Sequence, residues 1–285
     1  MPTLRARGID FYYEEHGRAG DPPLLMAHGL LSSVAMAPRF GERIEDIAAR
    51  GLYVVAYDAR GHGRSGYTTD RADYRCSSLA DDMHAIVEAL DLAPVSIYGG
   101  SMGAAAAMVL AIEHPEDVDK LILRAPPGIG RGIRPARRRF AGLAWLYRVL
   151  GPRLTGTFVA LTLAARRERR EHPNLDLRSF IASQRRAAIV PAIEGLLGDE
   201  SFPVDRVGTI GHRTLLLAHG GDTIHPLTSA EALRARIPNA TLCVAPDAQY
   251  WADRPGALSQ IVAEFVIDGR APGASDPMMA ACSVG

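Results

Sequence analysis

The stretch VSIYGGSMGAAAAMVLAIE, residues 95–113, indicates the fold more directly than any other part of the chain. Its first four residues suit a short buried strand. A glycine-rich turn follows, and residues 102–113 are then small and apolar on almost every side, as expected of a helix that packs tightly on a sheet. A strand, a sharp turn and a helix are therefore predicted within this one segment.

Other parts of the chain repeat the order of apolar strand and helix. Short apolar runs, each bounded by turn residues, occur at 23–27, 52–57, 120–123, 214–218 and 240–245. Residues 79–92 space their apolar side chains three and four positions apart, which predicts an amphipathic helix. Strands that alternate with helices are typical of βαβ units. The sequence therefore predicts an α/β fold: a mostly parallel central sheet with helices on both faces.

This alternation stops between about residues 128 and 205. The segments FAGLAWLYRVL (140–150) and LRSFIASQRRAAIVPAIEGLL (177–197) have a helical period, and no convincing strand accompanies them. We expect a helical lid, residues 128–205, inserted after the strand near Leu123. The α/β body would then be residues 1–127 and 206–268. Residues 269–285 are small, turn-rich and without periodicity, which predicts a mobile tail.

Composition excludes several classes of protein. The 285 residues carry 32 basic and 32 acidic side chains, and 47% are hydrophobic, which argues against a nucleic-acid binder and against a disordered chain. No apolar run reaches the ~18 residues that span a bilayer, and the first residues lack the apolar core of a secretory signal. The three cysteines are widely spaced and suggest neither a disulfide framework nor a zinc site. We expect a cytoplasmic protein with no integral membrane association, no metal and no cofactor.

The zero net charge conceals an uneven distribution. Residues 131–186 contain fourteen arginines against Glu168, Glu171 and Asp176, a formal charge of +11, so the rest of the chain carries −11. Arginine recognises carboxylates and phosphates, so this segment could attract a small-molecule substrate that is anionic or that is carried on an acidic carrier protein. Solvated helix faces would explain the same arginines. A basic amphipathic segment also suits a peripheral position on an anionic membrane surface.

The turn in the opening stretch carries a chemical motif. Gly99, Ser101 and Gly103 form the pattern G-x-S-x-G between the predicted strand and helix. A serine is a useful nucleophile here if the turn thrusts its Oγ clear of the sheet, and glycine on both sides avoids clashes in such a turn. The alternative is a serine that caps the N-terminus of the helix.

Four motifs together resemble the serine-nucleophile branch of the α/β-hydrolase superfamily, over residues 23–266. They are His28-Gly29 after the first parallel strand, DARGHGRS (58–65) after the next, the turn at Ser101, and HGGD (219–222) after the proposed lid. The resemblance implies that the backbone N–H groups of Leu30 and Met102 form an oxyanion hole. It also implies that Asp222 orients and stabilises an imidazolium, although a loop carboxylate in an Asx-turn is the alternative. His28, His62 and His219 occupy positions that the resemblance associates with loop structure.

The sequence departs from the superfamily at the catalytic base. The resemblance implies a histidine after the last strand, but the stretch APDAQYWADRP (245–255) contains none, and none follows it. Gln249, or Ala248 if the alignment shifts by one residue, occupies the position. An amide cannot accept a proton near neutral pH. Loss of the base costs other triad enzymes up to about six orders of magnitude in rate.

Three explanations remain for the absent base. His225, three residues after Asp222, could serve as a displaced base. The fold could instead support a non-hydrolytic lyase or cyclase, or a catalytically silent protein that binds a small ligand. Substrate could also supply the base itself. Our leading prediction is a hydrolase that acts on an ester, thioester or lactone through Ser101, with an atypical or displaced base.

Overall fold

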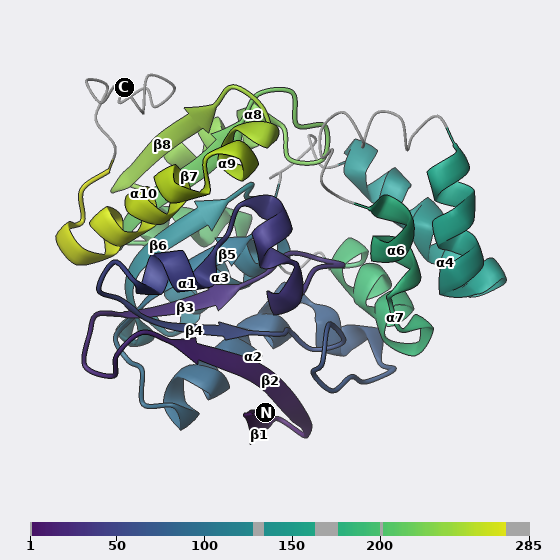
Figure 1. The fold of residues 1–285 in the computed structure, drawn as a ribbon, viewed down its shortest axis with the longest axis horizontal. Coiled ribbons are helices and arrows are strands. Elements are labelled where there is room, and N and C mark those ends of the chain that lie inside the picture. Colours follow the sequence, from purple (N-terminus) through teal and green to yellow (C-terminus); the bar gives the residue numbers. More distant parts are fainter. Residues whose placement is uncertain (1, 128–133, 163–175, 200–201, 272–285) are drawn as a thin grey trace.

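The central sheet has eight strands and is mostly parallel, as predicted. The computed structural model describes residues 2–127, 134–162, 176–199 and 202–271. The strand order is β1-β2-β4-β3-β5-β6-β7-β8; β1 and β2 run antiparallel to their neighbours, and β3 to β8 are parallel (Figure 1). The strands are β1 (Thr3–Ala6), β2 (Ile9–His16), β3 (Pro23–Ala27), β4 (Tyr53–Tyr57), β5 (Val95–Gly100), β6 (Val118–Arg124), β7 (Arg213–His219) and β8 (Ala240–Ala245).

Helices cover both faces of this sheet (Figure 1). The core on one face includes side chains of α1 (Ile44–Ala48) and α10 (Pro255–Asp268). The core on the other face includes α2 (Cys76–Ala89), α3 (Met102–Glu113) and α8 (Leu227–Arg234). The parallel strands are buried from both sides, which explains why they are continuous apolar runs in the sequence.

In the described part of the chain between β6 and β7 lie three α-helical elements: α4 (Arg134–Leu161), α6 (Leu177–Ala182) and α7 (Arg186–Leu197). We call residues 128–205 the insertion; within its described part there is no strand. The helices share a core of their own that includes Ala144, Tyr147, Ile181, Ile189 and Ile193, and this core reaches the body at Leu31 and Tyr74. Segments 128–133, 163–175 and 200–201 of the predicted lid lie outside the described residues, as does the predicted tail beyond residue 271.

One predicted helical segment, 177–197, is divided in two. The chain leaves the helical conformation between Ala182 and Arg186. In this break the Gln184 side chain donates a hydrogen bond to the backbone oxygen of Leu31, at 2.8 Å. The apolar period continues through the break, but a contact with the body interrupts the helix, and the sequence period alone does not reveal such a contact.

The remaining short helices connect the main elements. They are α9 (Gln249–Asp253) and the 3₁₀ segments η1 (Val34–Phe40), η2 (Arg71–Tyr74), η3 (Pro115–Asp117) and η5 (Val204–Thr209). None of the helices in the described ranges is both long and apolar enough to cross a membrane.

Among the cysteines, Cys76 is a free, buried thiol. Cys282 lies outside the described residues, so the expectation that the cysteines form no disulfide framework stays a prediction.

Candidate active site

Ser101 lies in a sharp turn between β5 and α3. Its φ of 48° and ψ of −104° are strained for a residue with a side chain. A Cβ on Gly99 would lie 2.6 Å from the Gly103 oxygen, and one on Gly103 would lie 2.3 Å from the Ala27 oxygen. The two glycines of the motif are therefore required because strand and helix approach too closely for any side chain.

Ser101 contacts a histidine. Its Oγ lies 2.7 Å from Nε2 of His225, and Nδ1 of the same ring lies 3.2 Å from Oδ2 of Asp222. Asp222 and His225 belong to the segment that leaves the carboxyl end of β7, which we call the β7 loop (residues 219–226). The structure thus brings Ser101, His225 and Asp222 into a hydrogen-bonded line. All three side chains are partly buried.

Asp222 also orders the β7 loop itself. Its Oδ1 accepts hydrogen bonds from the backbone N–H groups of Ile224 and His225, both at 2.7 Å. Burial alone would raise the pKa of Asp222, but hydrogen bonds from His219 and His225 outweigh burial and hold the pKa well below its usual range. The carboxylate is therefore an anion that organises the loop with one oxygen and faces imidazoles with the other.

His219 contacts the same carboxylate oxygen of Asp222 as His225 does. Its Nε2 lies 3.2 Å from Oδ2 of Asp222, and its Nδ1 lies 3.1 Å from the oxygen of Gly220. Burial favours the neutral ring, but the hydrogen bonds to Asp222 and Gly220 prevail, and the pKa of His219 is raised. Each nitrogen of the His219 ring faces an oxygen that accepts a hydrogen bond, and this arrangement favours the protonated, imidazolium form of the ring. The sequence interpretation assigned His219 to loop structure and missed this contact; the signal available was that His219 and His225 each lie three residues from Asp222.

His28 and His62 differ from His219. Nε2 of His28 accepts a hydrogen bond from the Ala59 N–H at 2.9 Å, and Nδ1 lies 2.8 Å from the Gly29 oxygen. Nδ1 of His62 lies 2.8 Å from the Arg60 oxygen. Burial lowers the pKa of His28 to about 4 and that of His62 to about 3, so both rings are neutral at pH 7. These contacts fit the interpretation that the two rings shape loops.

The loop after β3 passes beside Ser101. A Cβ on Gly29 would lie 3.3 Å from Cβ of Ser101. The next N–H in this loop belongs to Leu30, and the first N–H of α3 belongs to Met102. Within the described residues neither group donates a hydrogen bond. Both are thus available to a ligand of Ser101.

The Gln249 side chain forms its hydrogen bond within α9. Gln249 is the first residue of α9, and its Nε2 donates a hydrogen bond to Oδ1 of Asp253 at 2.8 Å. Of the two candidates that the sequence offered for the place beside Ser101, His225 is the one at hydrogen-bond distance from Oγ.

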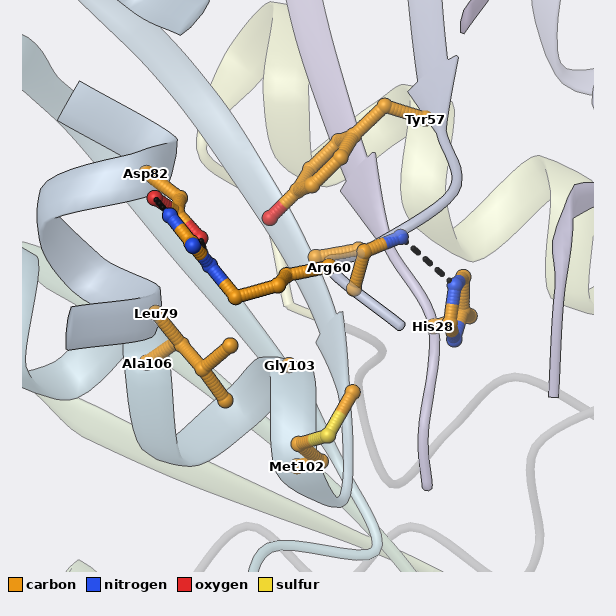
Figure 2. Close-up of a pocket in the computed structure, with 10 residues that line it drawn as sticks. His28, Tyr57, Arg60, Leu79, Asp82, Met102, Gly103 and Ala106 are labelled. Carbon is orange, nitrogen blue, oxygen red and sulfur yellow. Dashed lines mark hydrogen bonds and ion pairs between the residues drawn. The ribbon is translucent and has the colours of Figure 1, made fainter. Parts of the chain in front are cut away.

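One pocket lies beside the start of α3 and is lined by residues that hold the fold together. Met102, Gly103 and Ala106 of α3 line it, together with an ion pair between Arg60 and Asp82 (Figure 2). Nε of Arg60 lies 2.7 Å from Oδ2 of Asp82, and both side chains are buried. The pair ties the loop after β4 to α2. Ser101, Asp222 and His225 do not line this pocket, so it is not where they would meet a substrate.

Some arginines of the insertion contact other groups. Nη1 of Arg139 in α4 donates a hydrogen bond to Oγ1 of Thr223 in the β7 loop, at 2.8 Å. Arg148 pairs with Glu194 of α7 at 2.6 Å. Five of the fourteen arginines lie outside the described residues: 131, 166, 167, 169 and 170. The contact of Arg139 with the β7 loop was not predicted from the sequence.

Three potential metal ligands gather at the end of α3: His84, His114 and Asp117. Nδ1 of His84 lies 2.6 Å from Oδ2 of Asp117, and this hydrogen bond raises the pKa of His84. The rings of His84 and His114 are stacked, with centroids 3.8 Å apart and planes 14° apart. Nearly parallel rings cannot both direct a lone pair at one ion, so the arrangement suits a carboxylate–histidine pair better than a metal site.

The chain is similar to known proteins over most of its length. A family model described as "alpha/beta hydrolase fold" matches residues 22–252. The putative carbamate hydrolase RutD of Caulobacter vibrioides is 30% identical over 236 residues, which cover 80% of this chain and 84% of that protein.

Solved structures share the fold at lower sequence identity. A carboxylesterase structure from the thaumarchaeon Nitrososphaera gargenis has a TM-score of 0.77 and 20% identity, and covers 94% of this chain and 100% of its own. The enol-lactonase of Burkholderia xenovorans LB400 has a TM-score of 0.75 and 18% identity, and covers 93% and 99%. Since the family model covers most of the residues, the chain belongs to the α/β-hydrolase fold family and is an enzyme of that family.

Proposed function

We propose that this protein hydrolyses an ester, thioester or lactone, with Ser101 as nucleophile, His225 as base and Asp222 as the acid member. The observation that carries the proposal is the 2.7 Å separation of Ser101 Oγ and His225 Nε2. A general base must lie within hydrogen-bond reach of the proton it removes, and this distance meets that condition. The base would then come from the β7 loop in place of the loop after the last strand.

In the first step, His225 Nε2 accepts the Ser101 proton while Oγ attacks the carbonyl carbon of the substrate. The ring becomes an imidazolium whose Nδ1–H donates to Asp222, and the anionic Asp222 stabilises the new charge. The carbonyl oxygen becomes an oxyanion, which the N–H groups of Leu30 and Met102 would receive. In other enzymes one such donor is worth about 3 kcal/mol.

The intermediate then collapses. His225 donates its proton to the leaving alcohol or thiol, and the acyl group stays on Ser101. In a lactone the leaving oxygen stays attached to that acyl chain. Water next loses a proton to His225 and attacks the acyl carbon, and the released Ser101 regains its proton. The sum is substrate plus water to a carboxylic acid and an alcohol or thiol.

The named activities of similar proteins are consistent with this class of reaction. A carbamate hydrolase, a carboxylesterase and an enol-lactonase all act on a carbonyl carbon that carries a heteroatom leaving group. These names support the reaction type and leave the substrate open. We further propose an anionic substrate, because the Arg139 guanidinium lies beside the β7 loop. A carrier protein and a cytoplasmic location remain predictions.

The direct test is labelling by a fluorophosphonate, followed by intact mass and peptide mapping. We expect one adduct, located on Ser101 and absent from Ser101→Ala. His225→Ala should slow labelling at least about a thousandfold, since the base is lost. Gln249→Ala serves as the matched control and should label normally.

One outcome would overturn the proposal. If the wild-type protein forms no adduct where a control serine hydrolase is labelled fully, nucleophilic catalysis by Ser101 is excluded. A lyase, a cyclase or a silent binding protein on the same fold would then be the better explanation.

A further inference from the structure

The element α4 is bent at Gly151, where φ is 73° and ψ is 167°, and both of its helical parts expose large apolar side chains to solvent. They are Trp145, Val149, Leu150, Leu154, Phe158 and Leu161, and we call them the α4 apolar face. Trp145 is 62% exposed, Leu154 61% and Leu161 83%. Ala144, Tyr147 and Thr155 of the same element are buried. So many large apolar side chains exposed on one element are unusual for a surface in water, and such exposure marks an interaction site.

The charge on α4 is of one sign. Six arginines and no acidic residue lie between Arg134 and Leu161. Arg148 and Arg153 are both exposed and lie in the sequence among the residues of the α4 apolar face; Arg148 also pairs with Glu194 of α7. An occupant that offers apolar surface and negative charge together would suit this face.

We propose that the α4 apolar face binds the surface of an anionic lipid bilayer. The acyl boundary would receive the apolar side chains, and the anionic headgroups would receive the arginines. A second copy of the chain fits less well, because a symmetric α4–α4 contact would bring arginine against arginine. Since no described helix can span a membrane, the binding is peripheral. Figure 1 shows the helix labelled α4 at the edge of the molecule, on the side away from the sheet.

The intrinsic fluorescence of Trp145 can report this binding. Of the two tryptophans in the chain, Trp145 lies in the α4 apolar face and Trp251 is buried at 1% exposure. Fluorescence should shift to the blue with vesicles of phosphatidylcholine and phosphatidylglycerol, and not with phosphatidylcholine alone. Trp145→Phe should abolish the shift while sedimentation still detects binding. The Ser101→Ala protein is used so that no lipid is cleaved.

Two variants measure the apolar and the charged contributions. Leu154→Ser combined with Phe158→Ser should weaken sedimentation with anionic vesicles at least about tenfold. Arg153→Gln should weaken binding several-fold and reduce its dependence on salt. Ile267→Ser, which removes an exposed apolar residue from α10, is the matched control and should bind as wild type does. Circular dichroism should be unchanged in the double variant, and so should hydrolysis of a water-soluble ester when the double variant retains Ser101.

The proposal fails if the protein binds neither type of vesicle, or binds both equally. It also fails if sedimentation velocity reveals a dimer that the double variant abolishes, since a second copy would then cover the face. Vesicle binding is measured without turnover. Its failure would leave the proposed hydrolysis untouched, and failed labelling of Ser101 would leave the membrane proposal untouched.

Discussion

Two neighbouring loops at the carboxyl edge of the sheet differ sharply in what they present to Ser101. In the β7 loop two histidines contact Asp222, and one of them, His225, contacts Ser101. The segment that follows β8 (246–254), which we call the β8 loop, contains α9, and in α9 Gln249 is hydrogen-bonded to Asp253. The two loops are adjacent, since the Gly220 N–H donates to the Ala245 oxygen at 2.9 Å. The position of a loop on the sheet edge, rather than the order of loops along the chain, determines which side chain can reach Ser101.

The largest expected effect tests this difference directly. His225→Gln should lower kcat by about five to six orders of magnitude, because no proton acceptor remains beside Ser101. Gln249→Ala should keep kcat within about threefold, since its amide contributes only a hydrogen bond within α9. Hydrolysis of a p-nitrophenyl ester measures both. Full activity of His225→Gln together with loss in Gln249→Ala would assign the chemistry to the β8 loop.

Asp222→Asn should have the next largest effect, about four orders of magnitude in kcat. The amide oxygen can still accept the N–H groups of Ile224 and His225, so the loop should keep its shape. The negative charge that stabilises the imidazolium is lost. Asp253→Asn makes the same change in the β8 loop and should be nearly silent. A small effect of Asp222→Asn would show that the carboxylate only orders the loop and does not stabilise the imidazolium.

The sequence predicted the parts that depend on local sterics. Gly99 and Gly103 are needed wherever a strand and a helix meet so closely, so the turn at Ser101 and the sheet around it were visible from the residues. The spacing between His225 and Asp222 made His225 a candidate base. The orientation of its ring could not be predicted, because it depends on how the β7 loop packs against Ser101, which is 124 residues away from His225 in the chain. The apolar period of 140–150 predicted a helix, but a period cannot tell that Trp145 and Val149 face solvent.

His219 gives the β7 loop a dependence on pH. Its pKa is raised in the folded protein, so its charge stabilises the fold fully below the unfolded value of about 6.5, and the contribution is lost as pH rises through the raised value. His219→Gln should therefore cost about 1–2 kcal/mol near pH 5.5 and less at alkaline pH. Urea unfolding across this range measures it. Gln249→Ala, which changes no ionisable group, should give a difference independent of pH; the same result for His219→Gln would contradict the ion pair.

The salt dependence of kcat/KM tests whether the charge of the insertion acts on the substrate. If the arginines of the insertion attract an anionic substrate, kcat/KM for a carboxylated ester should fall several-fold between low and moderate salt. A neutral ester of similar size should show a flat response. Equal responses of the two esters would indicate that salt acts on the protein generally and would remove the steering role.

The smallest expected effect concerns the contact between the insertion and the β7 loop. Arg139 bonds Thr223 next to Asp222, so Arg139→Gln should lower kcat/KM about two- to fivefold by loosening that loop. Arg148→Gln is the matched control, because Arg148 pairs with Glu194 inside the insertion and should leave the rate unchanged. A loss confined to Arg139→Gln would mean that the insertion acts on the chemistry through the β7 loop. Equal losses would mean that both variants merely disturb the insertion, and the contact with Thr223 would then have no special role.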